Sequence, residues 1–211
     1  MPEPFILPRP AVFIDRDDTL VACMTLPDEA WRRPDGSLRR RGDLLNAELL
    51  RPLEGARAAC QALRDAGYRL VVVTNQGGAA FEPGALPLID ACGRRLRELL
   101  VSVEGEPLID AVYACPFHPG GTEPRFAAEH PWRKPAPGMI RAACRELHLD
   151  PLRSWAIGDK ERDLQAAIEA GVPPHQTILV DAEYGLAAAA EAILVRGGHK
   201  PGGGGGGGGG G

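Results

Sequence analysis

Five short apolar runs recur along the chain, and each is followed by polar residues. Runs of this kind, rich in Val, Ile and Leu, are typical of buried strands in parallel sheets. The predicted strands are Ala11–Ile14, Leu70–Val73, Ala111–Tyr113, Trp155–Ile157 and Thr177–Val180.

Segments of mixed polar and apolar residues lie between these runs and predict helices. Two of the segments are followed by Gly67 and Gly171, at the position where a left-handed residue commonly ends a helix. Strands that alternate with helices indicate a parallel sheet with both faces covered, and right-handed crossovers make it a doubly wound, Rossmann-like α/β fold. The predicted helices are Gly55–Ala66, Leu86–Leu100, Pro137–Leu147 and Lys160–Ala170.

Residues 21–50 interrupt this alternation, because they separate the first strand from its helix by about 30 residues where two to six are usual. Pro34-Asp35-Gly36 favours a turn in this segment, and Asp43–Leu50 favours a short helix. A long loop at the catalytic end of a sheet is often a lid, and a solvated, charged excursion is the alternative.

Composition narrows the classes of protein that fit. Of 211 residues, 44% are hydrophobic and 25% charged, which is near the globular average and predicts one packed domain over residues 10–198. The net charge of −4 lacks the basic excess typical of nucleic-acid binding, and no apolar stretch approaches the roughly 20 residues that span a bilayer. We therefore expect a monomer with no nucleic-acid or membrane partner.

Cysteine usage and the two ends of the chain add further expectations. The five cysteines follow no regular spacing, and the start at Met1 has no long apolar leader, which together favour a reducing, cytoplasmic location. The last ten residues, Gly202–Gly211, are all glycine and have no side chains to bury, so we expect the Gly-rich tail 199–211 to be disordered and to lie outside the fold.

Asp15 and Asp17 directly follow the first predicted strand, where a substrate is expected in an open α/β sheet. They are two positions apart, so both face the same side of an extended chain. Crowded carboxylates repel each other unless a cation or a shared proton relieves them. The pair therefore predicts chemistry, with a solvated turn as the alternative.

The later strand ends supply complementary groups. Thr74-Asn75-Gln76-Gly77-Gly78 follows the second strand and offers a hydroxyl, amides and flexible backbone to an oxyanion. Arg133 and Lys134 come after the third strand, and Asp159 after the fourth. Carboxylates from two strand ends with a lysine and a hydroxyl predict a Mg²⁺-assisted phosphoryl site, since Mg²⁺ prefers one or two carboxylates together with waters and phosphate oxygens.

Four motifs thus occur in order: Asp-x-Asp-x-Thr at 15–19, Thr-Asn-Gln at 74–76, Arg-Lys-Pro-x-Pro-Gly-Met at 133–139 and Gly-Asp-x-x-x-Asp at 158–163. This order resembles that of the haloacid dehalogenase (HAD) phosphatases. More narrowly, it is similar to the D-glycero-D-manno-heptose 1,7-bisphosphate phosphatases, and the related histidinol-phosphate phosphatases share much of the pattern. The resemblance covers residues 10–182 and implies a HAD-like fold without a large cap domain.

The resemblance implies a Mg²⁺-dependent phosphatase of a small phosphorylated metabolite, most simply heptose 1,7-bisphosphate. One alternative is a histidinol-phosphate phosphatase, whose cationic substrate calls for an acidic or aromatic pocket to which Asp18 and Trp132 would contribute. The other is a non-catalytic phosphate-binding regulatory module.

The resemblance also assigns roles to the residues of the site. Asp15 would be the nucleophile that forms an aspartyl-phosphate, and Asp17 the general acid and then base. Thr74 would donate to the phosphoryl group, and Lys134 would neutralise it and hold Asp15. Asp159 would bind Mg²⁺ with Asp15 and the backbone carbonyl of Asp17.

The remaining roles lie around this centre. Asn75 and Gln76 are expected to bind the phosphate, and Arg133 to contact substrate beyond the reacting phosphate. Lys160 would lie beside the metal aspartate. Asp163 would orient the groups that bind the metal.

The chain also departs from the pattern of these relatives. Asp18 stands where they usually have glycine, and it would add negative charge near the site or point to solvent. An arginine usually follows Thr-Asn-Gln and is absent here, so arginines from residues 32–41, such as Arg32, Arg33 and Arg39, are expected to contact a distal phosphate in its place.

Many relatives carry a zinc loop, which this chain has only in part. Cys115, His118 and His130 offer at most three ligands, and structural zinc normally needs four. Phe117 and Trp132 occupy two of the ligand positions. Zinc is therefore not expected, and we predict that this loop is held by apolar packing.

Overall fold

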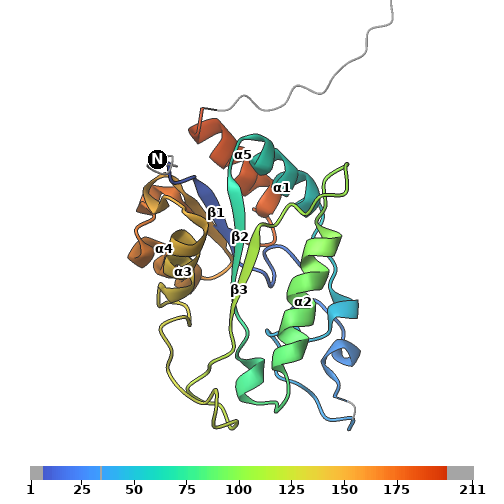
Figure 1. The fold of residues 1–211 in the computed structure, drawn as a ribbon. Helices are drawn as coiled ribbons and strands as arrows, with labels where there is room; N and C mark the ends of the chain where they lie inside the picture. The colour runs from blue at the N-terminus through green and yellow to red at the C-terminus, as the bar shows by residue number, and fades with distance from the viewer. Residues whose placement is uncertain (1–6, 34, 199–211) are drawn as a thin grey trace, which may run out of the picture.

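The computed structural model describes residues 7–33 and 35–198, and a five-stranded parallel sheet forms its centre (Figure 1). The sheet confirms the doubly wound α/β fold, with strand order β3-β2-β1-β4-β5. The predicted tail 199–211 and Pro34 of the predicted turn lie outside the described residues. The strands are β1 (Ala11–Ile14), β2 (Arg69–Asn75), β3 (Ala111–Cys115), β4 (Trp155–Gly158) and β5 (Thr177–Leu179).

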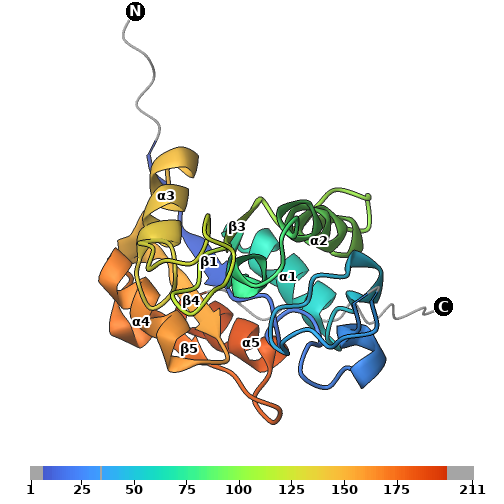
Figure 2. The ribbon, with the colours of Figure 1, turned by 90° about the horizontal axis from the view of Figure 1, so that it is seen from below.

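Helices cover both faces of the sheet, as Figures 1 and 2 show. All four predicted helices are present, each within a residue or so of its expected bounds, and a fifth follows β5. The helices α1, α2 and α5 lie on one face, and α3 and α4 on the other. The helices are α1 (Ala56–Asp65), α2 (Leu86–Leu99), α3 (Gly138–Leu147), α4 (Glu161–Ala170) and α5 (Leu186–Arg196).

The two faces divide the core by the alternation of each strand. Val12 and Ile14 of β1 pack among α1, α2 and α5, while Ala11 and Phe13 pack among α3 and α4. All four are at most 1% exposed, which is the burial expected of a central parallel strand. No described helix is both long enough and apolar enough to cross a bilayer.

Helix α5 was not predicted from the sequence. Its segment is dominated by alanine and aliphatic residues and lacks the polar face that marks an amphipathic helix. Gly185 precedes it without a side-chain cap, so the usual start signal is also missing. The helix is stabilised by burial instead, because Leu186, Ala190 and Ile193 pack in the main core.

The segment 21–50 is anchored by buried side chains at several points, while most of the described residues in 32–42 are exposed. Trp31, Leu44 and Leu50 are each at most 1% exposed and belong to the same core as α1 and α5. The predicted short helix in 43–50 is a single 3₁₀ turn, Ala47–Leu49, and a second such turn spans Asp28–Trp31. These anchors hold the segment beyond the carboxyl ends of the strands, and its role as a lid stays a prediction.

The burial of α5 leads to a stability prediction. Ile193→Ala removes a fully buried side chain from the core and is expected to lower the free energy of unfolding by about 2–5 kcal/mol. Val195→Ala, two residues away and 59% exposed, is the matched control and should change it by less than about 0.5 kcal/mol. Urea denaturation measures both variants, and equal effects would contradict the docking of α5.

Candidate active site

The carboxyl ends of β1, β2 and β4 meet at one edge of the sheet, where the sequence motifs were expected to converge. They enclose a pocket of about 80 Å³ with polar walls. A larger cavity of about 900 Å³ lies between α2, β3 and the 115–134 loop, is mostly apolar and includes none of the predicted catalytic groups. The small pocket is lined by Asp15, Asp17, Asp18, Met24, Gly42, Thr74, Asn75, Asp159, Lys160 and Arg162.

Lys134 lies at the centre of this site and is almost completely buried. Its Nζ is 2.5 Å from Asp15 Oδ1 and 2.7 Å from Asp163 Oδ1, and it donates to the carbonyl oxygen of Val73 at 2.7 Å. An ammonium has three hydrogens, and these three acceptors account for all of them. Lys134 is therefore fixed against the predicted nucleophile, as the sequence assignment required.

The single positive charge of Lys134 does not offset the burial of Asp15 and the negative charges around it. Burial raises its pKa from 3.8 to about 7, and the carboxylates of Asp163 and Asp17 act in the same direction, while Lys134 opposes them. A nucleophilic carboxylate must be ionised, so the site favours an additional cation close to Asp15.

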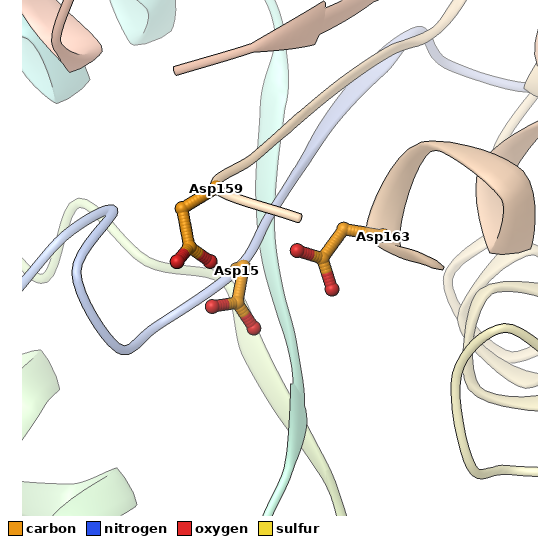
Figure 3. A group of neighbouring side chains, drawn as sticks. All are labelled: Asp15, Asp159 and Asp163. Atoms are coloured by element: carbon orange, nitrogen blue, oxygen red, sulfur yellow. The ribbon is translucent and has the colours of Figure 1, made fainter. Parts of the chain in front are cut away.

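Three carboxylates provide a place for such a cation. Ligand oxygens of Asp15, Asp159 and Asp163 all lie within 4.8 Å of one another, and their carboxylates turn toward the same space (Figure 3). Asp159 is also paired with Lys160, with Nζ 2.5 Å from Oδ2. A set of carboxylate oxygens fits a hard cation such as Mg²⁺.

Asp163 has a larger part in the site than the sequence indicated. Its Oδ2 accepts a hydrogen bond from the backbone N–H of Lys160 at 3.0 Å, which caps α4, and its Oδ1 pairs with Lys134. These contacts match the predicted orienting role. Its position in the acidic group also allows it to bind a cation directly.

Gly158 makes this arrangement possible, and the sequence assignment overlooked it. A Cβ at this position would lie 2.4 Å from Asp163 Cβ and 2.7 Å from Asp163 Oδ2. Any other residue would therefore push Asp163 away from Lys134. The glycine before Asp159 in the motif was the available signal.

Asp17 points to a different set of partners. Arg16 donates two hydrogen bonds to the carboxylate of Asp17, and Gln76 Nε2 donates to Asp17 Oδ2 at 2.8 Å. Arg16 is 1% exposed and was not singled out from the sequence, although an arginine between two aspartates at a buried strand end was a usable signal. The structure thus separates Asp15, held by Lys134, from Asp17, held by Arg16.

The strand β2 runs to Asn75, two residues beyond its predicted end, because it pairs with β3 up to Cys115. Asn75 exchanges two hydrogen bonds with the backbone of Lys134, at 2.9 and 3.0 Å. Gln76 is fully buried and donates to Thr74 Oγ1 as well as to Asp17. Both amides are engaged within the protein, so their expected contact with phosphate stays a prediction, while Thr74 lines the pocket.

Asp18, the third carboxylate, closes the turn that follows β1. It has a left-handed backbone with φ 57°, and its Oδ1 accepts hydrogen bonds from the N–H groups of Cys23 and Met24, both at 2.9 Å. The side chain lines the pocket and is held by the backbone, which favours the alternative that Asp18 adds negative charge near the site. This turn leads the chain into the 21–50 segment.

The three arginines expected to reach a distal phosphate are occupied elsewhere. Arg33 and Arg39 pair with Glu82, and Arg32 donates to the carbonyl oxygen of Gly36. A contact of these three residues with a distal phosphate stays a prediction.

Arg40 of the same segment reaches further toward the site. Its Nη1 is 3.1 Å from His118 Nε2, and its guanidinium lies over the ring of Phe81. Arg133 and His118 both lie against Gly77. A Cβ added to this glycine would be 3.1 Å from Arg133 Nη1 and 3.1 Å from His118 Cβ. Burial and the positive charges of Arg133 and Arg40 lower the pKa of His118.

The loop that holds zinc in many relatives is filled with ring contacts. His130 stacks on Phe117 with ring centroids 4.0 Å apart, and Trp132 packs edge-on against Tyr113. Cys115 is buried in the core beneath α3 and α4. The three potential ligands thus have separate partners, and the absence of zinc stays a prediction.

The chain is similar to known proteins over most of its length. The family model of the haloacid dehalogenase-like hydrolases matches residues 27–171. A D-glycero-D-manno-heptose-1,7-bisphosphate 7-phosphatase of Thermosynechococcus vestitus is 36% identical over 78% of this chain and 76% of its own length.

Two solved structures are similar over most of the chain. A protein from Mesorhizobium loti described as a HAD-like phosphatase has 31% identity and a TM-score of 0.67, with 90% of this chain and 88% of that chain covered. The D,D-heptose 1,7-bisphosphate phosphatase of B. bronchiseptica, solved with magnesium and phosphate, has 24% identity and a TM-score of 0.63, with 89% and 99% covered, and supports the fold.

The acidic group predicts a pH-dependent response to Mg²⁺. A carboxyl whose folded pKa is raised from 3.8 to about 7 loses its stabilising proton as the pH rises through this range, so metal-free protein loses stability there. Mg²⁺ binds only ionised carboxylates and stabilises the folded state by mass action. Mg²⁺ is therefore expected to raise Tm more at pH 8 than at pH 5, as differential scanning calorimetry measures.

Two controls make this test specific. Na⁺ at equal ionic strength should not reproduce the effect, and Asp159→Asn, which removes one charge from the group, should reduce it. A Tm shift by Mg²⁺ that is the same at pH 5 and pH 8 would contradict the assignment of Asp15 to the cation site.

Proposed function

Because the chain belongs to the haloacid dehalogenase-like hydrolases and is a phosphoric monoester hydrolase, we propose that it removes one phosphate from D-glycero-D-manno-heptose 1,7-bisphosphate with the help of Mg²⁺. The observation that carries this proposal is the pairing of buried Lys134 with Asp15, beside the carboxylates of Asp159 and Asp163. This arrangement brings a nucleophile, a cation for the phosphoryl group and a group of metal ligands together at one edge of the sheet.

Asp15 is the nucleophile in this proposal. Its carboxylate oxygen attacks phosphorus to give an aspartyl-phosphate, and Lys134 Nζ offsets charge on the phosphoryl oxygens. Thr74, whose hydroxyl already accepts from Gln76, is placed to donate to one of those oxygens. Asp15 and Asp159, with the backbone carbonyl of Asp17 and with Asp163 beside them, would hold Mg²⁺, which when bound screens the repulsion between the carboxylate and the phosphoryl group.

Asp17 serves both half-reactions. It gives a proton to the departing sugar oxygen, and it then takes a proton from the water that attacks the phosphorus of the intermediate. Its position at the wall of the same pocket as Asp15 and Thr74 supports this role.

Positive charge around the pocket supports a substrate with a second phosphate. Lys160 and Arg162 line the pocket. Arg133 and Arg40 lie beside His118, and their positive charges, together with burial, lower its pKa. Burial lowers the pKa of Arg133, and the nearby positive charges of Arg162 and Arg40 lower it further. The neighbouring anion, Asp43, acts in the opposite direction. The arginines of this group can bind an anionic end of the substrate.

The histidinol-phosphate alternative has weaker support. Asp18 is committed to the amides of Cys23 and Met24. Trp132 lines the larger apolar cavity rather than the small pocket.

The five cysteines are free, which supports the further proposal of a reducing, cytoplasmic location.

Substrate comparison tests the proposed function directly. With Mg²⁺, kcat/KM for heptose 1,7-bisphosphate is expected to exceed that for histidinol phosphate and for a sugar monophosphate, and Asp15→Asn should abolish turnover by removing the nucleophile. Phosphate release measures all of these. A preference for histidinol phosphate would select the rival enzyme, and wild type without activity across the panel would support a silent phosphate-binding module.

The position of Arg40 predicts a selective effect on the bisphosphate. Arg40→Ala is expected to raise KM for heptose 1,7-bisphosphate by roughly tenfold, the size of one lost charge-assisted hydrogen bond, with little change for a monophosphate. Arg32→Ala is the matched control, because Arg32 is exposed and donates only within its own loop. Equal effects of the two variants would contradict a role of Arg40 at the second phosphate.

A further inference from the structure

Arg16 is a charged side chain held inside the protein next to the site. It is 1% exposed, its Nε donates to Asp17 Oδ1 at 2.9 Å, and its Nη2 donates to Asp17 Oδ2 at 2.8 Å. A guanidinium that binds both oxygens of a carboxylate fixes the plane of that carboxylate as well as its place.

Further hydrogen bonds hold the guanidinium itself. Arg16 Nη2 also lies 2.8 Å from the carbonyl oxygen of Leu44 and 2.9 Å from Gln76 Oε1. Gln76 in turn donates through Nε2 to Asp17 Oδ2 and to Thr74 Oγ1. Arg16, Asp17 and Gln76 therefore form a closed ring, and Leu44 ties this ring to the 21–50 segment.

A buried ion pair of this kind is weak evidence of a stabilising role. Removing two charges from water costs about as much free energy as their attraction returns, and apolar residues of similar size often stabilise as well. A ring that fixes one carboxylate beside a catalytic pocket is better explained by orientation.

We propose that Arg16 is a positioning residue for Asp17, an inference that rests on the proposed acid–base role of Asp17. Arg16 and Gln76 hold Asp17 in one orientation at the pocket wall. Oδ2 accepts from both of them, whereas Oδ1 accepts from Arg16 alone. Oδ1 is thus the oxygen with a lone pair left to carry the transferred proton.

The proton balance of the two steps defines what this orientation serves. In the first step, Asp15 forms the new O–P bond, the bond from phosphorus to the sugar oxygen breaks, and that oxygen receives the proton from Asp17 Oδ1. In the second step, Oδ1 takes a proton from water, the water oxygen bonds to phosphorus, and the bond to Asp15 breaks. Arg16 stays protonated throughout.

The leaving group provides a test that does not depend on folding yield. A poor leaving group, such as the sugar alkoxide, needs the proton from Asp17, whereas p-nitrophenolate leaves without one. The ratio of kcat/KM for the sugar phosphate to kcat/KM for p-nitrophenyl phosphate therefore reports general-acid catalysis. The fraction of active protein cancels in this ratio.

Arg16→Lys keeps the positive charge but removes the guanidinium that donates to both oxygens of Asp17. We expect Arg16→Lys to lower this ratio by roughly tenfold. This loss is smaller than that expected of Asp17→Asn, which should lower the ratio by about 10²–10⁴. The double variant Arg16→Lys/Asp17→Asn should show the ratio of Asp17→Asn alone, because Arg16 acts through Asp17. Arg69→Lys is the matched control, since Arg69 pairs with Asp110 at the opposite end of β2.

The outcomes separate the inference from the function on which it rests. An unchanged ratio in Arg16→Lys, or additive effects in the double variant, overturns the positioning role while Asp17 keeps its own. An unchanged ratio in Asp17→Asn overturns the acid–base assignment of Asp17 and the inference with it. A lowered ratio in Arg69→Lys would show that the ratio reports general destabilisation, and it would overturn the inference as well.

Discussion

The ion pair between Lys134 and Asp15 is the contact on which the rest of the site depends. Lys134 is buried, reaches Asp15 and Asp163 at once, and is held by its backbone through Asn75. A buried ammonium is stable only where its hydrogens have acceptors. The carboxylates in turn need its charge to lie so close to one another, so the acidic group and the lysine each require the other.

The site distributes its charges by function. One carboxylate, Asp15, is matched with Lys134 and the metal ligands, and the other, Asp17, is matched with Arg16 and Gln76. Two carboxylates that share one environment would compete for the same proton and the same cation. Separate partners let two neighbouring groups of one type take different chemical tasks.

Much of the fold and the site could be predicted from the sequence, because strands and strand-end motifs are local patterns. The alternation of apolar runs and amphipathic segments was enough for four helices and the parallel sheet, while α5 has no polar face to reveal it. Asp15, Thr74 and Asp159 converge because parallel strands end at one edge, and Lys134 reaches Asp15 from the loop that follows β3. The contact of Arg16 with Leu44 and the contacts of Arg40 could not be predicted, since they join the 21–50 segment to other parts of the chain, where spacing does not determine contacts.

The sequence separation within the central ion pair has a consequence for the order of folding. Lys134 Nζ and Asp15 Oδ1 meet across 119 positions, and the loop that carries Lys134 leaves from the edge strand β3. Closing so long a loop costs conformational entropy, so we expect this contact to follow the pairing of the intervening strands. During synthesis the nucleophilic carboxylate therefore precedes its cation by more than half the chain, and the pocket closes only once β1, β2 and β3 lie side by side.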